Sequence, residues 1–133
     1  MRTLLFILLF ASQASAITLE IIGKKGQLLF KYDQSIQLPS HVGEASLDIF
    51  KQHQLAYKGG SYGFTSIFDL EQNLEIISDI EMKAHGWCFS VNGLTPETMA
   101  DETSIPDQTT IIRWYYAYAH YKSDQWIGQC VKN

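Results

Sequence analysis

Hydrophobic and polar positions alternate at the start of the chain's main domain. Residues 17–22 (ITLEII) and 27–32 (QLLFKY) are rich in apolar and β-branched side chains, and Gly23 and Gly26 bracket the segment between them. Alternation with a period of two, interrupted by glycines, is typical of two strands joined by a tight turn. The sequence therefore predicts an opening β-hairpin.

The next segment changes to a helical period. After Pro39, apolar residues recur mostly at intervals of three to five positions, at Val42, Ala45, Ile49, Phe50 and Leu55. Such spacing places these side chains on one face of a helix. We predict that this helix ends before the glycines at positions 59 and 60, and it is the only helix that the pattern predicts.

Three later segments, residues 62–68, 86–91 and 110–119, have the composition of strands. In the second, Trp87, Phe89 and Val91 should face the helix, and Cys88 should face the other side of the sheet. Residues 74–83 have a mixed pattern and receive no assignment. The order strand, strand, helix, strands predicts an α+β domain, with a β-grasp-like mixed sheet packed against one main helix.

The first residues have the features of an export signal. Arg2 precedes an apolar run over residues 4–11, and small residues follow up to Ala16. An apolar run of about 8 residues spans roughly 12 Å as a helix, well short of the ~30 Å core of a bilayer. We predict a signal peptide over residues 1–16, a single domain over residues 17–133, and a secreted product, periplasmic or extracellular.

The charge of the chain argues against nucleic acid as a partner. There are 10 basic and 14 acidic residues, which give a formal net charge of −4, and the basic residues form no cluster. A phosphate backbone is bound by concentrated lysine and arginine side chains. After residue 16 we also expect no segment that spans a membrane, because no later apolar run is long enough.

The chain has two cysteines, Cys88 and Cys130. Their even number and the predicted export favour a disulfide, because oxidising compartments preserve such bonds. Closing a loop of about 40 residues stabilises a fold by on the order of 4 kcal/mol in the chain-entropy model. The alternative is two free thiols.

Three segments resemble a known family. They are residues 62–67 (YGFTSI), 86–93 (GWCFSVNG) and 111–116 (IIRWYY). They are similar to blocks of the domain shared by the C-terminal part of transcobalamin and intrinsic factor and by many bacterial exported proteins. The signature residues of the first two segments are Tyr62, Thr65, Ser66, Gly86, Trp87, Phe89, Val91, Asn92 and Gly93. The Asn-Gly pair also predicts a tight turn after the second segment.

The resemblance implies a β-grasp-like fold and says less about function. Transcobalamin holds cobalamin between this domain and a large helical barrel, for which this chain has no counterpart. The chain also departs from the family at two places: Gln108 and Thr109 replace the usual Gly-Asp pair before the last strand, and residues 120–133 extend beyond the usual end. We therefore expect a changed turn and an additional tail.

Two motifs raise the question of catalysis. Ser61 lies in a Gly-x-Ser-x-Gly pattern, but a hydrolase nucleophile needs a strand before it and a helix after it, the reverse of the predicted order. His85 and Cys88 are spaced like half of a metal site, whereas structural zinc needs a second close pair. A disulfide would also remove the thiolate that a catalytic Cys88 needs. We predict no catalytic residue, no metal and no cofactor.

Aromatic residues concentrate near the end of the chain. The candidates for binding are Trp114, Tyr116, Tyr118, Tyr121 and Trp126. Alternate rings on a strand point to opposite faces, so one set should line the second face or an edge of the sheet. These rings either form an open platform or lie under the tail. We favour the covered arrangement, in which Cys130 pins the tail and Trp126 packs on the face opposite the helix.

These observations lead to one main hypothesis and two alternatives. We predict an exported, non-enzymatic binding module for a partner protein or a small molecule of unknown identity. One alternative is a carrier of a hydrophobic or corrinoid-like small molecule, which needs a ligand-sized apolar pocket. The other is a small hydrolase built on Ser61, which needs a histidine within hydrogen-bond reach of that hydroxyl.

Overall fold

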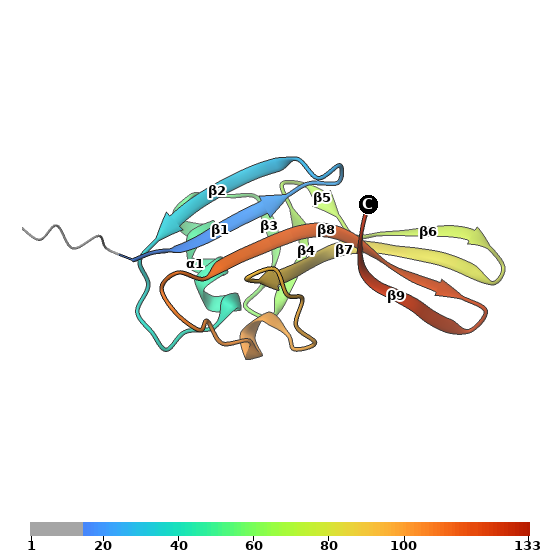
Figure 1. Ribbon diagram of the computed structural model, residues 1–133. Helices are drawn as coiled ribbons and strands as arrows, with labels where there is room; N and C mark the ends of the chain where they lie inside the picture. Colours follow the sequence, from blue (N-terminus) through green and yellow to red (C-terminus); the bar gives the residue numbers. More distant parts are fainter. Residues whose placement is uncertain (1–14) are drawn as a thin grey trace, which may run out of the picture.

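The computed structural model describes residues 15–133, so the signal peptide predicted over residues 1–16 lies almost entirely outside the described residues. Residues 15–133 form a mixed α/β fold that consists mostly of strands (Figure 1). It has a six-stranded mixed sheet, a three-stranded sheet and one α-helix. None of the helices in this part of the chain is long and apolar enough to cross a membrane.

The predicted opening hairpin is confirmed. β1 (Ile17–Ile22) pairs antiparallel with β2 (Leu28–Gln34), and every second side chain of β1, at Ile17, Leu19 and Ile21, is fully buried. Gly26 has φ 77° in the connecting turn, a left-handed conformation that glycine adopts without steric cost. β1 also pairs in parallel with β8 (Ile111–Lys122), which makes the main sheet mixed.

The predicted helix is also confirmed, as α1 (Val42–Gln52). Its apolar face packs on the main sheet through residues such as Ile49 and Phe50, both of which are fully buried. Gly43 lies so close to the loop before β4 that an added Cβ would stand 1.7 Å from the carbonyl oxygen of Ser61. Only glycine allows the helix to approach that loop.

The three-stranded sheet packs beside the helix on the same side of the main sheet. It has the order β3-β4-β5 and is formed by β3 (Tyr57–Gly60), β4 (Gly63–Ile67) and β5 (Leu70–Glu71). The ring of Phe64 in β4 stacks on Phe50 of α1 at 4.6 Å and meets Trp114 of β8 edge to face at 4.8 Å. These three rings join the two sheets and the helix in one core.

Two long strands carry the main sheet beyond the helix. β7 (Glu81–Val91) and β8 pair antiparallel along their whole length, and their far halves pair with β6 (Asn73–Ser78) and β9 (Gln125–Lys132). We call this four-stranded extension, residues 73–85 and 117–132, the arm (Figure 1). Residues 74–83, which received no assignment from the sequence, form most of β6 and the start of β7.

The predicted orientation of side chains on β7 is confirmed. Trp87, Phe89 and Val91 pack against the core, and Cys88 is joined to Cys130 of β9 by a disulfide with a Cα–Cα distance of 5.9 Å. Residues 15–133 contain no free cysteine. The predicted pairing of the two cysteines is therefore present.

The predicted position of Trp126 is wrong. The tail does not fold over the sheet face, because it forms β9 and pairs edge to edge with β8, with Trp126 opposite Tyr121. Trp126 contacts the ring of Tyr121 at 5.1 Å and remains 51% exposed. The tail therefore widens the arm, and it contacts β8 rings at only a few points, with the ammonium of Lys132 lying 5.4 Å from the ring centre of Tyr115.

Candidate functional site

A tight turn ends β7 at the predicted Asn-Gly pair. Asn92 and Gly93 have φ 50° and 84°, the positive values that a two-residue hairpin turn requires. Val91 and Leu94 exchange backbone hydrogen bonds of 2.8 and 3.1 Å across the turn. The side chain of Asn92 accepts a hydrogen bond from the backbone N–H of Ile111 at 2.8 Å, which fixes the end of β7 to the start of β8.

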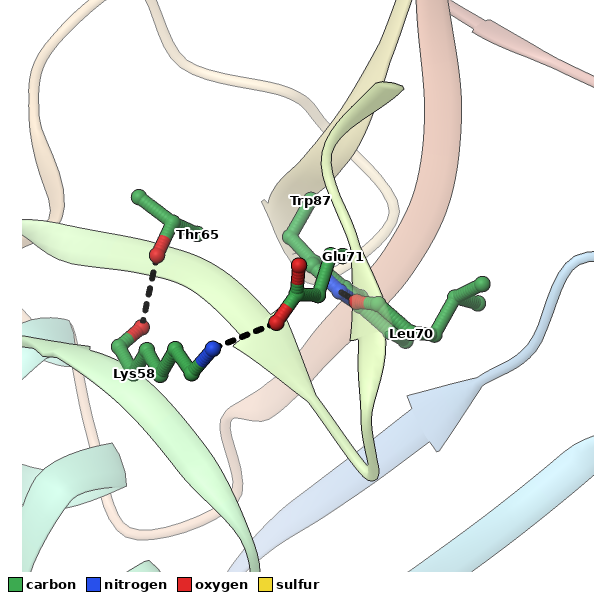
Figure 2. Close-up of polar contacts among 5 residues, drawn as sticks. All are labelled: Lys58, Thr65, Leu70, Glu71 and Trp87. Atoms are coloured by element: carbon green, nitrogen blue, oxygen red, sulfur yellow. Dashed lines mark hydrogen bonds and ion pairs between the residues drawn. The ribbon is translucent and has the colours of Figure 1, made fainter.

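Two aromatic side chains fasten the three-stranded sheet to the main sheet. The indole N–H of Trp87 donates to the carbonyl of Leu70 at 2.8 Å (Figure 2). The hydroxyl of Tyr116 donates to the carbonyl of Glu71 at 2.7 Å. Both acceptors belong to β5. Burial also raises the pKa of Tyr116, so its hydroxyl remains a hydrogen-bond donor at neutral pH.

The side chain of Glu71 in β5 forms a surface ion pair. The ammonium of Lys58 in β3 contacts the carboxylate of Glu71, and this hydrogen bond raises the pKa of Lys58 (Figure 2). The hydroxyl of Thr65 donates to the carbonyl of Lys58 at 3.4 Å. These contacts join β3 to β4 and β5, and the bond from Trp87 to Leu70 joins β5 to β7.

An aromatic groove opens between β4, β7 and the loop that follows the Asn-Gly turn. Its volume is about 290 Å³, and most of its surface is apolar. The side walls and floor are formed chiefly by Tyr62, Phe64, Trp87, Phe89, Met99 and Trp114. Tyr62 and Met99 are each 53% exposed at the rim, whereas Trp114 is 1% exposed. The groove is thus an accessible apolar cleft with a rigid aromatic base.

The groove lies beside a free edge of the main sheet. β6 pairs with β7 only over residues 81–85, and Leu94 pairs with Val91, so in the described part of the chain no strand pairs with residues 86–90 on that side. The backbone groups of Val91 point away from β8, because they bond to Leu94. Alternate residues of a strand point their backbone groups the same way, so Trp87 and Phe89 present theirs at this free edge.

The aromatic residues proposed from the sequence do not form one surface. Trp114 and Tyr116 are 1% and 5% exposed and donate hydrogen bonds to Ser46 and Glu71, so they belong to the interior. Tyr118 lies on the arm under the ammonium of Lys83, 4.6 Å from its ring centre. The five aromatic residues therefore do not form one open platform, because the three-stranded sheet and the helix cover Trp114 and Tyr116.

The remaining sequence motifs are placed apart from one another. The imidazole of His85 contacts the carboxylate of Glu75 at 2.8 Å, and this hydrogen bond lowers the pKa of Glu75. Cys88 is in the disulfide and has no thiolate to offer a metal or a substrate. In residues 15–133 no hydrogen bond joins Ser61 to a histidine, and no group of three or more His, Cys, Asp or Glu side chains could hold a metal ion.

Sequence reasoning missed part of the groove. Thr95, Pro96, Thr98 and Met99 come from an irregular loop, and nothing in their spacing reveals that the loop returns to β7. The signal that could have found the groove was the set of residues that resembles the signature of the transcobalamin-like domain. Four signature residues, Tyr62, Thr65, Trp87 and Phe89, line it although two separate segments supply them.

Comparison with protein-family models and with curated proteins gives no match. Among solved structures, the chain is similar to a protein from Ruminococcus gnavus that is provisionally described as a metal binding protein. The two share a fold. The TM-score is 0.51 and the sequence identity is 17%, and the match covers 77% of this chain and 95% of the other. At this identity the likeness concerns the fold alone.

Proposed function

We propose that this protein is an exported, non-enzymatic binding module that holds an extended segment of a partner protein at the free edge of β7. In this proposal the segment adds a strand beside residues 86–90 and places one apolar side chain in the aromatic groove. The observation that carries it is the position of the groove directly beside unpaired backbone groups of Trp87 and Phe89.

This arrangement suits a peptide because the two kinds of contact are complementary. Backbone groups at a free strand edge give affinity for an extended chain of any sequence, and an adjacent pocket selects the side chain. The rings of Phe64, Phe89 and Trp114 are held by one another at 4.8 and 5.1 Å, so they need little reordering when a ligand binds. Preorganised aromatic pockets are common anchors in protein interfaces.

The size of the groove disfavours the carrier alternative. Pockets for small ligands and cofactors typically measure about 300 to 1,000 Å³. A groove of about 290 Å³ matches a single large side chain better than a corrinoid ring. A small hydrophobic molecule remains the second candidate, since most of the groove surface is apolar.

The family relationship forms part of the proposal. We infer that the chain is a β-grasp-like relative of the C-terminal domain of transcobalamin, because signature residues from two separate segments meet in one groove. The disulfide between Cys88 and Cys130 is typical of proteins from oxidising compartments and supports export. Metal binding, suggested by the description of the Ruminococcus gnavus protein, is left out of the proposal because its likeness concerns the fold alone.

A display experiment tests the proposed function. A library of random, unstructured peptides is selected on the immobilised, disulfide-bonded protein, and the enriched peptides are measured by fluorescence anisotropy. We expect a consensus with one large apolar residue inside an extended stretch. Met99→Lys places a charge at the groove rim and should weaken binding at least about tenfold, because burying an unpaired charge is costly. Leu28→Lys is the matched control, since Leu28 is 56% exposed on β2 outside the groove.

Three results would contradict the proposal. The first is the absence of any enriched consensus, and the second is equal loss of binding in the Met99→Lys and Leu28→Lys variants. The third is a retained small molecule, seen as added mass when protein recovered from its own secretion compartment is examined by native mass spectrometry. If Met99→Lys released that mass, the carrier function would replace the peptide-binding one.

A further inference from the structure

A second cavity lies on the face of the main sheet that points away from the helix. Its volume is about 330 Å³, and Tyr115 forms part of its wall. Tyr115 lies on that face because it is directly opposite Cys88, and directly opposite residues share a face of the sheet. The cavity shares no lining residue with the aromatic groove, so what binds there does not depend on the proposed function.

Two strands meet end to end beside β8 at this cavity. β7 occupies one edge of β8, so β1 and β9 share the other edge. β1 runs parallel to β8 as far as Ile22, opposite Tyr115, whereas β9 runs antiparallel as far as Lys132, opposite Ala117. The C-terminal ends of β1 and β9 therefore face each other, and both line the cavity.

Three cationic side chains line the cavity, and no aspartate or glutamate does. They are Lys24, Arg113 and Lys132, in a chain whose formal net charge is −4. In residues 15–133 neither lysine forms an ion pair. Within the same residues the guanidinium of Arg113 bonds to Glu20 through Nε alone, at 3.0 Å. An arginine has five N–H donors, so the four on its Nη atoms remain for a ligand.

Two carboxylates lie near the cavity without lining it. Glu20 is the partner of Arg113 and holds that side chain on the sheet face. Glu75 of β6 is already bonded to His85 at 2.8 Å, and its pKa is lowered chiefly by that bond and less by the charge of Lys24. Three cations against two carboxylates leave an excess of positive charge at the cavity.

The fold holds the cationic groups in position. The ring of Tyr115 is only 4% exposed, and it lies under the ammonium of Lys132 at 5.4 Å from the ring centre. Lys24 belongs to the turn after β1, which is closed by a hydrogen bond of 2.8 Å from the Gly23 N–H to the carbonyl of Gln27. Groups that are ordered before binding lose less entropy when a ligand arrives.

We propose that this cavity binds a small organic phosphate monoester. Such an ester carries about −1.5 to −2 charges at neutral pH and three acceptor oxygens, which match the three cationic groups. The Arg113 fork suits two parallel hydrogen bonds to phosphate, and the two lysines act as point charges. A carboxylate has one charge and two oxygens, and would leave a cation without a partner.

The wall of the cavity also has a place for the organic part of the ester. More of its surface is apolar than polar, and Ile22 and Tyr115 supply apolar side chains beside the cations. Pockets for small ligands typically measure about 300 to 1,000 Å³. A cavity of about 330 Å³ is at the low end of this range and fits a molecule with a single ring.

Titration with phenyl phosphate, followed in NMR spectra of the backbone amides, tests the proposal on the disulfide-bonded protein. We expect saturable shifts at residues that line the cavity, with a Kd of about 10 µM to 1 mM. Benzoate has the same ring but a single charge, and should bind at least about tenfold more weakly. Inorganic phosphate lacks the ring and should bind at least about threefold more weakly than the ester.

Substitutions distinguish a defined site from general attraction between charges. Lys132→Gln should weaken the binding of phenyl phosphate at least about fivefold, because it removes a charged hydrogen-bond donor. Lys51→Gln is the matched control: it changes the net charge equally, but on α1, and should alter the affinity less than about twofold. Arg113→Lys keeps the charge beside Glu20 and loses the fork, so the affinity should fall at least about threefold.

The proposal is overturned if phenyl phosphate gives no saturable shifts up to about 10 mM, or if Lys132→Gln and Lys51→Gln weaken binding equally. Binding of benzoate as tight as that of phenyl phosphate would rule out selection for phosphate. Equal binding of inorganic phosphate would rule out the organic part. Thermal unfolding without ligand checks each variant, and Lys132→Gln, at an exposed position, provides the test even if Arg113→Lys unfolds.

Discussion

The indole N–H of Trp114 donates a hydrogen bond to the hydroxyl of Ser46 at 2.9 Å, and both side chains are fully enclosed between β8 and α1. It is a polar contact inside an otherwise apolar cluster. A buried donor is costly when it has no acceptor, because it loses its bonds to water on folding. Ser46 therefore fixes how the helix sits on the sheet, and with it the floor of the groove.

Removing this acceptor should destabilise the protein. Ser46→Ala leaves the Trp114 N–H buried and unpaired, so the free energy of unfolding should fall by about 1 to 3 kcal/mol. Urea denaturation followed by tryptophan fluorescence measures the change. Ser104→Ala, at an exposed position, should change the stability by less than about 0.5 kcal/mol. Equal effects of the two substitutions would show that the buried bond contributes nothing.

The parts of the fold that sequence predicts well are those in which one face is buried. β1 buries every second residue, and α1 buries Val42, Ile49 and Phe50 on one side, so burial imposes the periods that the sequence displays. The Asn-Gly turn is readable for another reason, because few residue pairs adopt two consecutive positive φ values. The alternation of side chains along β7 also placed Cys88 correctly, on the face of the strand that points away from the core.

The outer strand of the arm was not predicted from the sequence, because burial imposes no pattern of apolar and polar residues on it. All six residues of β6 are exposed, so no buried face imposes an alternation of apolar and polar residues on this strand. Trp126 was misplaced because composition cannot tell a tail that covers a sheet from one that extends it. Tyr116 was proposed as a binding residue because the sequence does not show that its hydroxyl donates a hydrogen bond to the carbonyl of Glu71 in β5. Only the three-dimensional packing shows this bond.

The disulfide should contribute substantially to stability. Cys88 and Cys130 are 42 residues apart, and a loop of that length is worth about 4 kcal/mol in the chain-entropy model, of which about 2 to 4 kcal/mol is usually realised. Replacing both cysteines with serine should lower the free energy of unfolding by that amount. In the unmodified protein, alkylation without reductant should label no thiol. Labelling of both cysteines would contradict the bond.

Because Trp126 is exposed, its contribution to stability can be measured separately from the contribution of β9. Trp126→Ala removes only its contact with Tyr121, so the loss of stability should stay below about 1.5 kcal/mol. Truncation before Ser123 removes the strand and the disulfide together, and should lower the midpoint of thermal unfolding much further. It should also increase the binding of a hydrophobic dye, because the side of β8 that pairs with β9 becomes open. Equal melting of both variants would mean that β9 stabilises nothing beyond the indole.

The turn before β8 should give the protein an acid-sensitive contact. Hydrogen bonds from the Thr109 hydroxyl at 2.7 Å and the Thr109 backbone N–H at 2.8 Å lower the pKa of Asp107 from its ordinary value of 3.8. This turn replaces the Gly-Asp pair of the resembled family. A carboxylate whose pKa is lowered by folding stabilises the native state above its unfolded pKa, and loses that contribution as the pH falls through its folded pKa.

Asp107→Ala should therefore lower the melting temperature at pH 7, and the difference from the unmodified protein should shrink once the pH drops below about 3.8. Asp107→Asn should lose less, because its amide oxygen can still accept the Thr109 N–H. Asp48→Ala controls for the change in net charge, since Asp48 is exposed on α1. Differential scanning fluorimetry between pH 2 and pH 8 measures all three variants at once. A melting difference for Asp107→Ala that stays constant over this range would show that the ionised carboxylate does not hold the turn.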